Sequence, residues 1–358
     1  FDTTKSWYTE TIDATYDACN PSTHDRCGTK YFPEKAYIVL TLDNVYIFDA
    51  EENALWMKFN AAVSLMIYGS SSIDNSSVYM LNGRMYVGTR GGGVGALNIV
   101  DFLQDKRNYI YTSGTVWYEH QLGIGSRNST SHVSVTGTYG IVNREINDVH
   151  AAVINGKTYV AVATDGGVSV INETDGTVKN FGSTGYSGGV ISSSVFLVQD
   201  RLYLTQGGST TQGQMYKIEI PSTDWTNGKA LFTAGDVLIA TNGYSSFWPQ
   251  ISNHINHANS LYVTEGTSSV DGTSNTVYFS TYSAQGSAPN GGAIILQEKQ
   301  GDDTNGSLKF FTKDYISEEM VGDIRGMWPM YGTLGATIAN NTYNIDDVSV
   351  KSSELTAK

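Results

Sequence analysis

A hairpin-like segment, residues 155–172, constrains the fold of this chain more than any other feature. It contains Asn155-Gly156, a β-rich run, a second turn built on Asp165-Gly166-Gly167, and a second β-rich run. Asn-Gly and Asp-Gly tolerate the positive φ angles of a tight turn, whereas Val and Tyr suit a pleated, half-buried surface. The segment therefore predicts two antiparallel strands.

The same unit recurs along the chain as polar turn residues followed by a tyrosine and an aliphatic residue. The tyrosines are Tyr46, Tyr86, Tyr159, Tyr203 and Tyr262, at intervals of 40, 73, 44 and 59 residues. Two intervals match a four-stranded propeller blade of roughly 40–50 residues, and the longer two leave room for insertions or a diverged blade. We expect an all-β fold, a β-propeller of about five to seven four-stranded antiparallel blades. A β-sandwich does not explain the recurrence, and a parallel β-helix repeats at about 20 residues.

The composition narrows the possible functions. A hydrophobic content of 40% supports a real core, and a formal net charge of −13 argues against nucleic-acid binding, which needs clustered Lys and Arg. No apolar run approaches the roughly 20 residues that cross a bilayer, so we expect no membrane insertion. The chain opens at Phe1 without a secretion signal, which leaves the compartment open.

The pattern predicts three regions. Residues 1–35 are polar and lack periodicity, so we interpret them as an N-terminal arm or adaptor. Residues 36–331 form the propeller, within which the irregular stretch 101–146 either elaborates the second unit or contains another blade. Residues 332–358 are a C-terminal linker or the start of a truncated further module.

The two cysteines, Cys19 and Cys27, lie in one Pro/Ser/Gly-rich loop. They are a disulfide candidate in an oxidising compartment, and two free thiols fit a reducing one equally well. A metal site formed with His24 lacks a nearby fourth ligand. We assign no metal ligands and expect no cofactor, although a structural calcium or zinc ion stays open.

Alignment on the tyrosines places polar residues at matching positions ahead of each turn. The innermost strand of a blade would lie there, beside the central channel. Beside the aligned position Asn253, His254 and His257 are the best metal or acid/base candidates. They would share an ion only through a bend, because residues three apart on a strand point to opposite faces. The candidate ligand-binding set at the channel mouth is Asn75, Ser77, Asp148, His150, Ser192, Ser194, Asn253, His254 and His257.

An aromatic segment at 243–249 is a candidate contact loop. Its residues Tyr244, Phe247 and Trp248 suit stacking on sugars or burial in a partner, and core filling between blades is the alternative. The run 91–96 imitates a dinucleotide-binding turn, but Asp-Gly-Gly-Val at the corresponding place in the next unit favours a hairpin. We assign no catalytic residues.

Three segments, residues 147–156, 164–172 and 322–332, resemble the propeller region of structural proteins of marine tailed bacteriophages. In that family the Trp-Pro junction, here Trp328-Pro329, is similar to one that leads into a concanavalin-like lectin domain. The present chain ends soon after it, at Lys358, so we expect no lectin module. The resemblance implies a non-enzymatic, virion-associated module of a tail fibre or spike. Its expected partners are other virion proteins or a host-surface glycan or protein; its oligomeric state does not follow from the sequence.

The alternative is a secreted glycan-active hydrolase or lyase with an active site in the propeller funnel. A glycosidase needs two carboxyl groups about 5–10 Å apart across the scissile bond. Among the aligned channel positions only Asp148 carries one. The enzyme hypothesis is therefore the weaker of the two.

Overall fold

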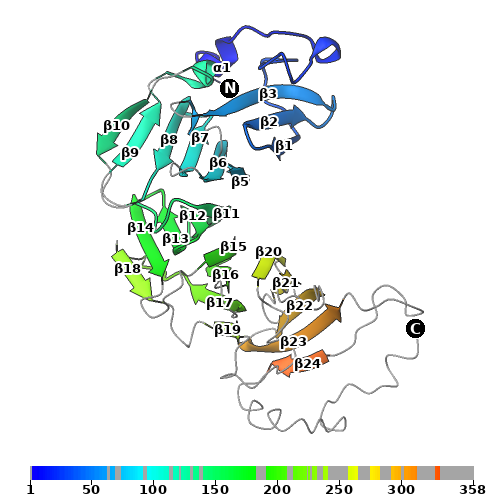
Figure 1. Cartoon of the computed structure of the whole chain (residues 1–358), viewed down its shortest axis with the longest axis vertical. Coiled ribbons are helices and arrows are strands. Elements are labelled where there is room, and N and C mark those ends of the chain that lie inside the picture. Colours follow the sequence, from blue (N-terminus) through cyan, green and yellow to red (C-terminus); the bar gives the residue numbers. More distant parts are fainter. Residues whose placement is uncertain are drawn as a thin grey trace, which may run out of the picture. The chain divides into compact units, whose positions relative to one another are not determined.

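The protein, seen in a computed structural model, is built almost wholly of β-strands (Figure 1). The structure describes residues 2–62, 65–68, 74–91, 95–112, 116–120, 122–129, 132–136, 140–182, 191–207, 213–223, 225, 228–231, 237–240, 257–264, 275–282, 292–299, 302–312 and 327–330. They belong to two compact units, Phe1–Asp200 with Glu219–Phe232, and Arg201–Ile218 with Thr233–Lys358. Within these ranges no helix is both long and apolar enough to cross a membrane.

The first unit begins with two short helical turns, α1 (Ser6–Thr9) and η1 (Tyr16–Ala18). The first sheet follows in the order β1 (Ala36–Leu40), β2 (Asn44–Asp49), β3 (Ala54–Ala62) and β4 (Ile67–Tyr68). Neighbouring strands are antiparallel except β3 and β4, which pair in parallel. The first three strands therefore form an up-and-down meander, to which β4 adds in parallel.

The second sheet contains six strands, again in chain order. They are β5 (Asp74–Leu81), β6 (Arg84–Arg90), β7 (Leu97–Asp101), β8 (Lys106–Ile110), β9 (Val116–His120) and β10 (His132–Thr136), with the turn η2 (Ile124–Ser126) before β10. The irregular stretch 101–146 therefore elaborates the outer part of this blade and does not form another one. Strands β6 and β7, which flank residues 91–96, pair antiparallel, as the hairpin interpretation predicts. A dinucleotide-binding turn would instead lead from a strand into a helix.

The third sheet contains the hairpin-like segment, residues 155–172. Its strands are β11 (Ile146–Ile154), β12 (Lys157–Thr164), β13 (Gly167–Asn172) and β14 (Thr177–Gly182), and β18 (Gly228–Leu231) pairs with β14 in parallel. Asn155 and Gly156 have φ angles of 51° and 75°, as a two-residue primed turn requires. The predicted hairpin is confirmed, with Tyr159 opposite Asn172. Strand β15 (Ile191–Val198) completes the described strands of this unit.

The second unit holds β16 (Arg201–Gly207), β17 (Gly213–Glu219) and β19 (Val237–Ala240), of which β17 and β19 are antiparallel. Its other sheet has the order β20 (His257–Thr264), β21 (Thr276–Tyr282), β22 (Gly292–Lys299), β23 (Asp302–Thr312) and β24 (Met327–Met330). All the pairs in that sheet are antiparallel.

Successive sheets of the first unit pack face to face. On β6, Met85 and Val87 enter a core with the first sheet, whereas Tyr86 between them enters a core with the third sheet. Alternate residues of a strand point to opposite faces, so a blade between two others buries both sets. Strand order and face packing together identify an all-β fold of the β-propeller type.

The N-terminal segment, which we expected to be an arm, is packed against the first two sheets. The indole of Trp7 lies in their shared core and donates a hydrogen bond to the Phe102 carbonyl at 2.9 Å. Further along, isolated bridges join Ala14 to Cys27 and Arg26 to Met57. Residues 2–35 therefore contribute to the core of the first unit.

Candidate functional site

The candidate site lies on the first strands of the second and third sheets, β5 and β11, and on β15. Both β5 and β15 contact β11. Strands β5 and β11 are edge strands of their sheets, so side chains and backbone groups on their free edges face the next blade. The polar residues predicted for the channel mouth come from these three strands.

The carboxylate of Asp148 joins all three strands. Its Oδ1 accepts hydrogen bonds from Ser77 Oγ at 2.8 Å and from the Val149 backbone N–H at 2.9 Å. Its Oδ2 accepts from Ser194 Oγ at 2.7 Å and from the Val195 backbone N–H at 3.0 Å. A carboxylate offers about four acceptor positions, and here four donors occupy them. We call Asp148, Ser77 and Ser194 the inner-strand clasp.

Burial and hydrogen bonding act on Asp148 in opposite directions. Burial raises the pKa of the Asp148 carboxyl, and the hydrogen bonds from Ser194, Val195, Ser77 and Val149 lower it in part. Among the described side chains of β5, β11 and β15, this is the one carboxylate. Because its oxygens are occupied by donors of the protein itself, Asp148 is poorly placed to take a proton from a substrate.

The imidazole of His150 occupies the next row of the same strands. It lies between Tyr79 of β5 and Phe196 of β15, with ring centroids 4.2 Å and 3.9 Å away. The Leu197 backbone N–H donates to Nδ1 at 3.1 Å, so Nδ1 is unprotonated and the proton is on Nε2. Burial lowers the pKa of His150 to about 4, which keeps the ring neutral at pH 7.

A third row is formed around Asn147. Its side-chain amide donates to the Ser192 carbonyl at 2.9 Å and to Asp165 Oδ1 at 2.9 Å, and its oxygen accepts from Arg90 Nη1 at 2.6 Å. The Ser192 hydroxyl is buried and forms no hydrogen bond within the described part of the chain. Neither Asn147 nor Arg90 was among the predicted site residues.

The structure thus brings six of the predicted channel residues onto the adjoining strands β5, β11 and β15, five of them with described side chains, but with a different register. Alignment on the tyrosines placed His150 level with Ser77 and Ser194; the structure places Asp148 there instead. The tyrosines fix the register inside each sheet and leave the offset between sheets undetermined. The aromatic partners Tyr79 and Phe196 were missed, although both lie two residues after a predicted serine.

The remaining predicted residues give less information. Asn75 lies on β5 opposite Thr89, and His257 opens β20 opposite Tyr282, but their side chains lie outside the described set. Asn253, His254 and the aromatic loop residues Tyr244, Phe247 and Trp248 lie outside the described residues. Ligand binding by the channel set stays a prediction.

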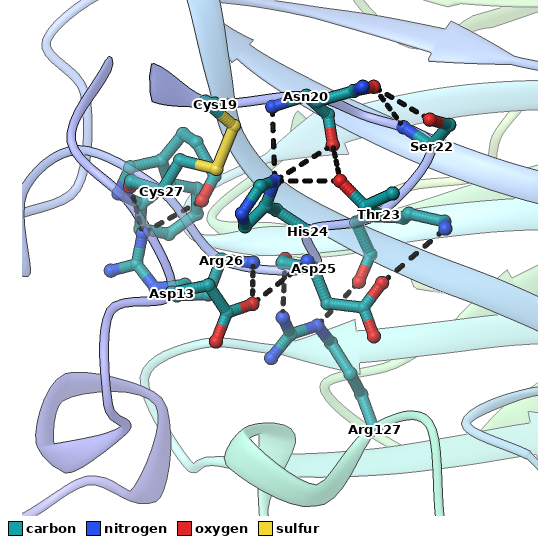
Figure 2. The surroundings of a disulfide bond; sticks show 12 residues. Asp13, Cys19, Asn20, Ser22, Thr23, His24, Asp25, Arg26, Cys27 and Arg127 are labelled. Atoms are coloured by element: carbon teal, nitrogen blue, oxygen red, sulfur yellow. Dashed lines mark hydrogen bonds and ion pairs between the residues drawn. A yellow bond between two sulfur atoms is a disulfide. The ribbon is translucent and has the colours of Figure 1, made fainter. Parts of the chain in front are cut away.

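The cysteine loop is closed by a disulfide. Cys19 and Cys27 are bonded, with Cα atoms 6.0 Å apart, as Figure 2 shows. Both thiols are consumed, and His24 Nδ1 accepts from the Asn20 backbone N–H at 3.1 Å. A metal site made of Cys19, His24 and Cys27 is therefore wrong for this structure. No cluster of metal-ligand residues occurs elsewhere in the described ranges.

Two arginines anchor this loop to the rest of the unit (Figure 2). Arg127 Nη2 donates to the Asp25 carbonyl at 2.7 Å. Its Nη1 lies 2.7 Å from both carboxylate oxygens of Glu10. The Arg26 guanidinium lies over the Trp56 ring at 4.3 Å, and burial lowers its pKa to about 10. These contacts hold the cysteine loop, and with it the N-terminal segment, against the rest of the first unit.

Comparison with known proteins assigns no family. No family model matches the sequence, and no curated protein matches it. Among solved structures, a chain of the mitotic checkpoint complex is 12% identical with a TM-score of 0.33, covering 78% of this chain and 84% of that chain. The Dos1 propeller is 13% identical with a TM-score of 0.37 and coverages of 73% and 62%. BBS1N, crystallised in complex with ARL6DN, is 12% identical with a TM-score of 0.34 and coverages of 78% and 72%.

Proposed function

We propose that this β-propeller is a virion-associated interaction module of a tail fibre or spike, which contacts a host-surface glycan or protein through its loops. The observation that carries the proposal is the hydrogen bonding of Asp148. The best-placed carboxylate of the inner strands is occupied on both oxygens by serine hydroxyls and backbone N–H groups. These strands are built to hold blades together, and a rigid scaffold with variable loops is a common way to present a binding surface.

The phage assignment rests on the sequence resemblance at residues 147–156, 164–172 and 322–332. The candidate contact residues are Tyr244, Phe247 and Trp248, because aromatic side chains supply much of the binding energy in many interfaces and stack on sugar rings. In this proposal the inner strands form a rigid scaffold, and Tyr244, Phe247 and Trp248 contact the host surface.

Binding is tested with the full chain immobilised on a biosensor. Intact cells of marine bacteria that tailed phages infect, and purified virions of those phages, are passed over it in turn. We expect a saturable response to cells or virions that falls at least about tenfold in a Tyr244→Ala/Phe247→Ala/Trp248→Ala variant, because aromatic hot spots contribute 2 kcal/mol or more. Val153→Ser, a change at an exposed residue of β11, is the matched control. A flat response to all cells and virions would refute the proposal.

The alternative, a glycan hydrolase or lyase, makes a different prediction for the same molecule. It requires turnover of a marine polysaccharide, and loss of turnover in Asp148→Asn with the fold intact. We expect no release of reducing ends or unsaturated products by the wild-type chain. Turnover that is abolished by Asp148→Asn, in a variant that is still folded at the assay temperature, would favour the enzyme.

A further inference from the structure

Residues 25–27, which end at one cysteine of the disulfide, pair with the edge of β3 in the first sheet (Figure 2). The Cys27 backbone N–H donates to the Trp56 carbonyl at 3.1 Å, and the Lys58 N–H donates to the Asp25 carbonyl at 2.9 Å. An antiparallel bridge lies between these two bonds. The segment therefore adds a short strand to the first sheet.

A further layer of chain lies outside this short strand. The Asp13 N–H donates to the Arg26 carbonyl at 2.8 Å, and the Gly28 N–H donates to the Ala14 carbonyl at 3.0 Å. We call residues 13–28 the latch segment. Its backbone is hydrogen-bonded to itself and to the edge of β3, and the disulfide lies within it.

The chain on either side of the latch segment is anchored independently of it. Before it, Trp7 lies in the core shared by the first two sheets and donates to the Phe102 carbonyl. After it, the ring of Phe32 packs against Trp56, with ring centroids 4.9 Å apart. The latch segment can therefore leave β3 as a loop while the sheets stay folded. Local openings of this kind have smaller free energies than global unfolding.

The docked position of the latch segment buries a charged side chain. Arg26 is fully buried, and its Nε lies 3.8 Å from a carboxylate oxygen of Glu10, which Arg127 approaches more closely at 2.7 Å. Burial lowers the pKa of Arg26 to about 10, although Glu10 raises it, so the side chain stays charged at pH 7. Removal of an ion from water is costly even when the ion is paired. Hydration of Arg26 therefore favours opening.

We propose that the Cys19–Cys27 disulfide is a redox latch, which holds the latch segment on β3 when oxidised and allows it to open when reduced. The two cysteines are 8 residues apart. A cross-link removes conformational entropy from the open loop, as it does from an unfolded chain. For a loop of this length, the opening equilibrium constant is about sixtyfold smaller in the oxidised protein. Oxidising surroundings thus close the latch, and a reducing cytosol releases it.

Reduction by a small dithiol is a thiol–disulfide exchange that starts at Cys19. The Cys19 side chain is partly exposed whereas Cys27 is fully buried, so the thiolate of the reagent bonds to the Cys19 sulfur. The Cys19–Cys27 bond breaks, and the Cys27 sulfur leaves as a thiolate that takes up a proton. The second thiolate of the reagent then displaces the Cys19 sulfur, which is protonated in turn. The reagent ends as a cyclic disulfide and the protein as two thiols.

The first test is hydrogen exchange of the full chain with and without dithiothreitol, measured by mass spectrometry. We expect the backbone N–H groups of Asp13, Cys27 and Gly28 to exchange about sixtyfold faster on reduction, because opening removes their acceptors. Exchange in β2 and β12 should not change. A Cys19→Ser/Cys27→Ser variant should show the faster rate in both conditions. Unchanged exchange in residues 13–28 on reduction, or an equal increase in β2, would overturn the proposal.

The second test measures opening at Cys27 and requires no variant. In the reduced protein, iodoacetamide converts an accessible thiolate into a thioether and releases iodide. Cys19 should react first, and Cys27 should react only when the latch segment opens. We expect the rate at Cys27 to be independent of urea below the unfolding transition, because a local opening exposes little surface. A rate that rises steeply with urea, as global unfolding requires, would also overturn the proposal.

Discussion

The inner-strand clasp makes a quantitative prediction about stability. In Asp148→Ala, the Val195 N–H loses its acceptor, and the hydroxyls of Ser77 and Ser194 lose their charged acceptor. The Val149 N–H keeps an acceptor, because Ser77 Oγ lies 3.1 Å from it. An unpaired buried N–H costs about 1–3 kcal/mol, and each hydrogen bond to a charged group contributes about 1.5–3 kcal/mol. Removal of a buried charge recovers several kcal/mol of desolvation. We expect a net loss of about 3 kcal/mol at pH 7.

Asp148→Asn distinguishes the hydrogen bonds from the charge. The amide can keep its oxygen for Ser194 and Val195 and donate from Nδ2 to Ser77 Oγ, so one hydroxyl proton is left over. The expected loss is about 1 kcal/mol. The assay is urea denaturation followed by tryptophan fluorescence, with Asp175→Asn as control. Asp175 is an exposed partner of Lys157, and its replacement should cost under about 1 kcal/mol.

Two results would refute this reasoning. The first is a stability of Asp148→Ala within about 0.5 kcal/mol of the wild type, which would mean that the buried charge costs as much as its hydrogen bonds contribute. The second is a larger loss in Asp148→Asn than in Asp148→Ala. A double-mutant cycle with Ser194→Ala then measures how much of the loss belongs to that hydroxyl.

Three further predictions concern other parts of the first unit. His150 has a folded pKa of about 4, below its ordinary 6.5, so the stability it contributes is complete above pH 6.5 and declines by about 3 kcal/mol as the pH falls through 4. The urea midpoint should therefore fall less steeply from pH 7 to 4 in His150→Phe than in the wild type. Parallel plots of urea midpoint against pH for the two proteins would contradict this. Gly167→Ala should cost more than Gly156→Ala, because both have positive φ angles but only at Gly167 would a Cβ meet backbone atoms, and equal losses in thermal denaturation would argue against the steric contribution. Reduction of the Cys19–Cys27 disulfide, whose separation is 8 residues, should cost about 2.5 kcal/mol, and denaturation of a Cys19→Ser/Cys27→Ser variant should not respond to reductant.

Features with a local cause were predictable from the sequence. The pairs Asn82-Gly83 and Asn155-Gly156 have positive φ angles at both residues, and few other residue pairs accept them. An Asn-Gly pair between two β-rich runs therefore predicts a hairpin. The three inner strands were found because turns and tyrosines locate them.

Features with a tertiary cause were not predictable in the same way. The offset that puts Asp148, not His150, between Ser77 and Ser194 depends on how separate sheets pack, and hairpin patterns carry no information about it. The N-terminal segment has no periodicity to indicate burial; Trp7 enters the core as a single anchor.

The inner-strand clasp also has a consequence for how the chain is made. Ser77 lies 71 residues before Asp148, and Ser194 lies 46 residues after it. A growing chain that ends before β15 carries Asp148 on a sheet edge with only half of its donors, so its carboxylate stays in water. Contacts of such long sequence separation form slowly and late. During synthesis, the third sheet would therefore become an interior blade only when Ser194 and Val195 of β15 donate their hydrogen bonds to Asp148.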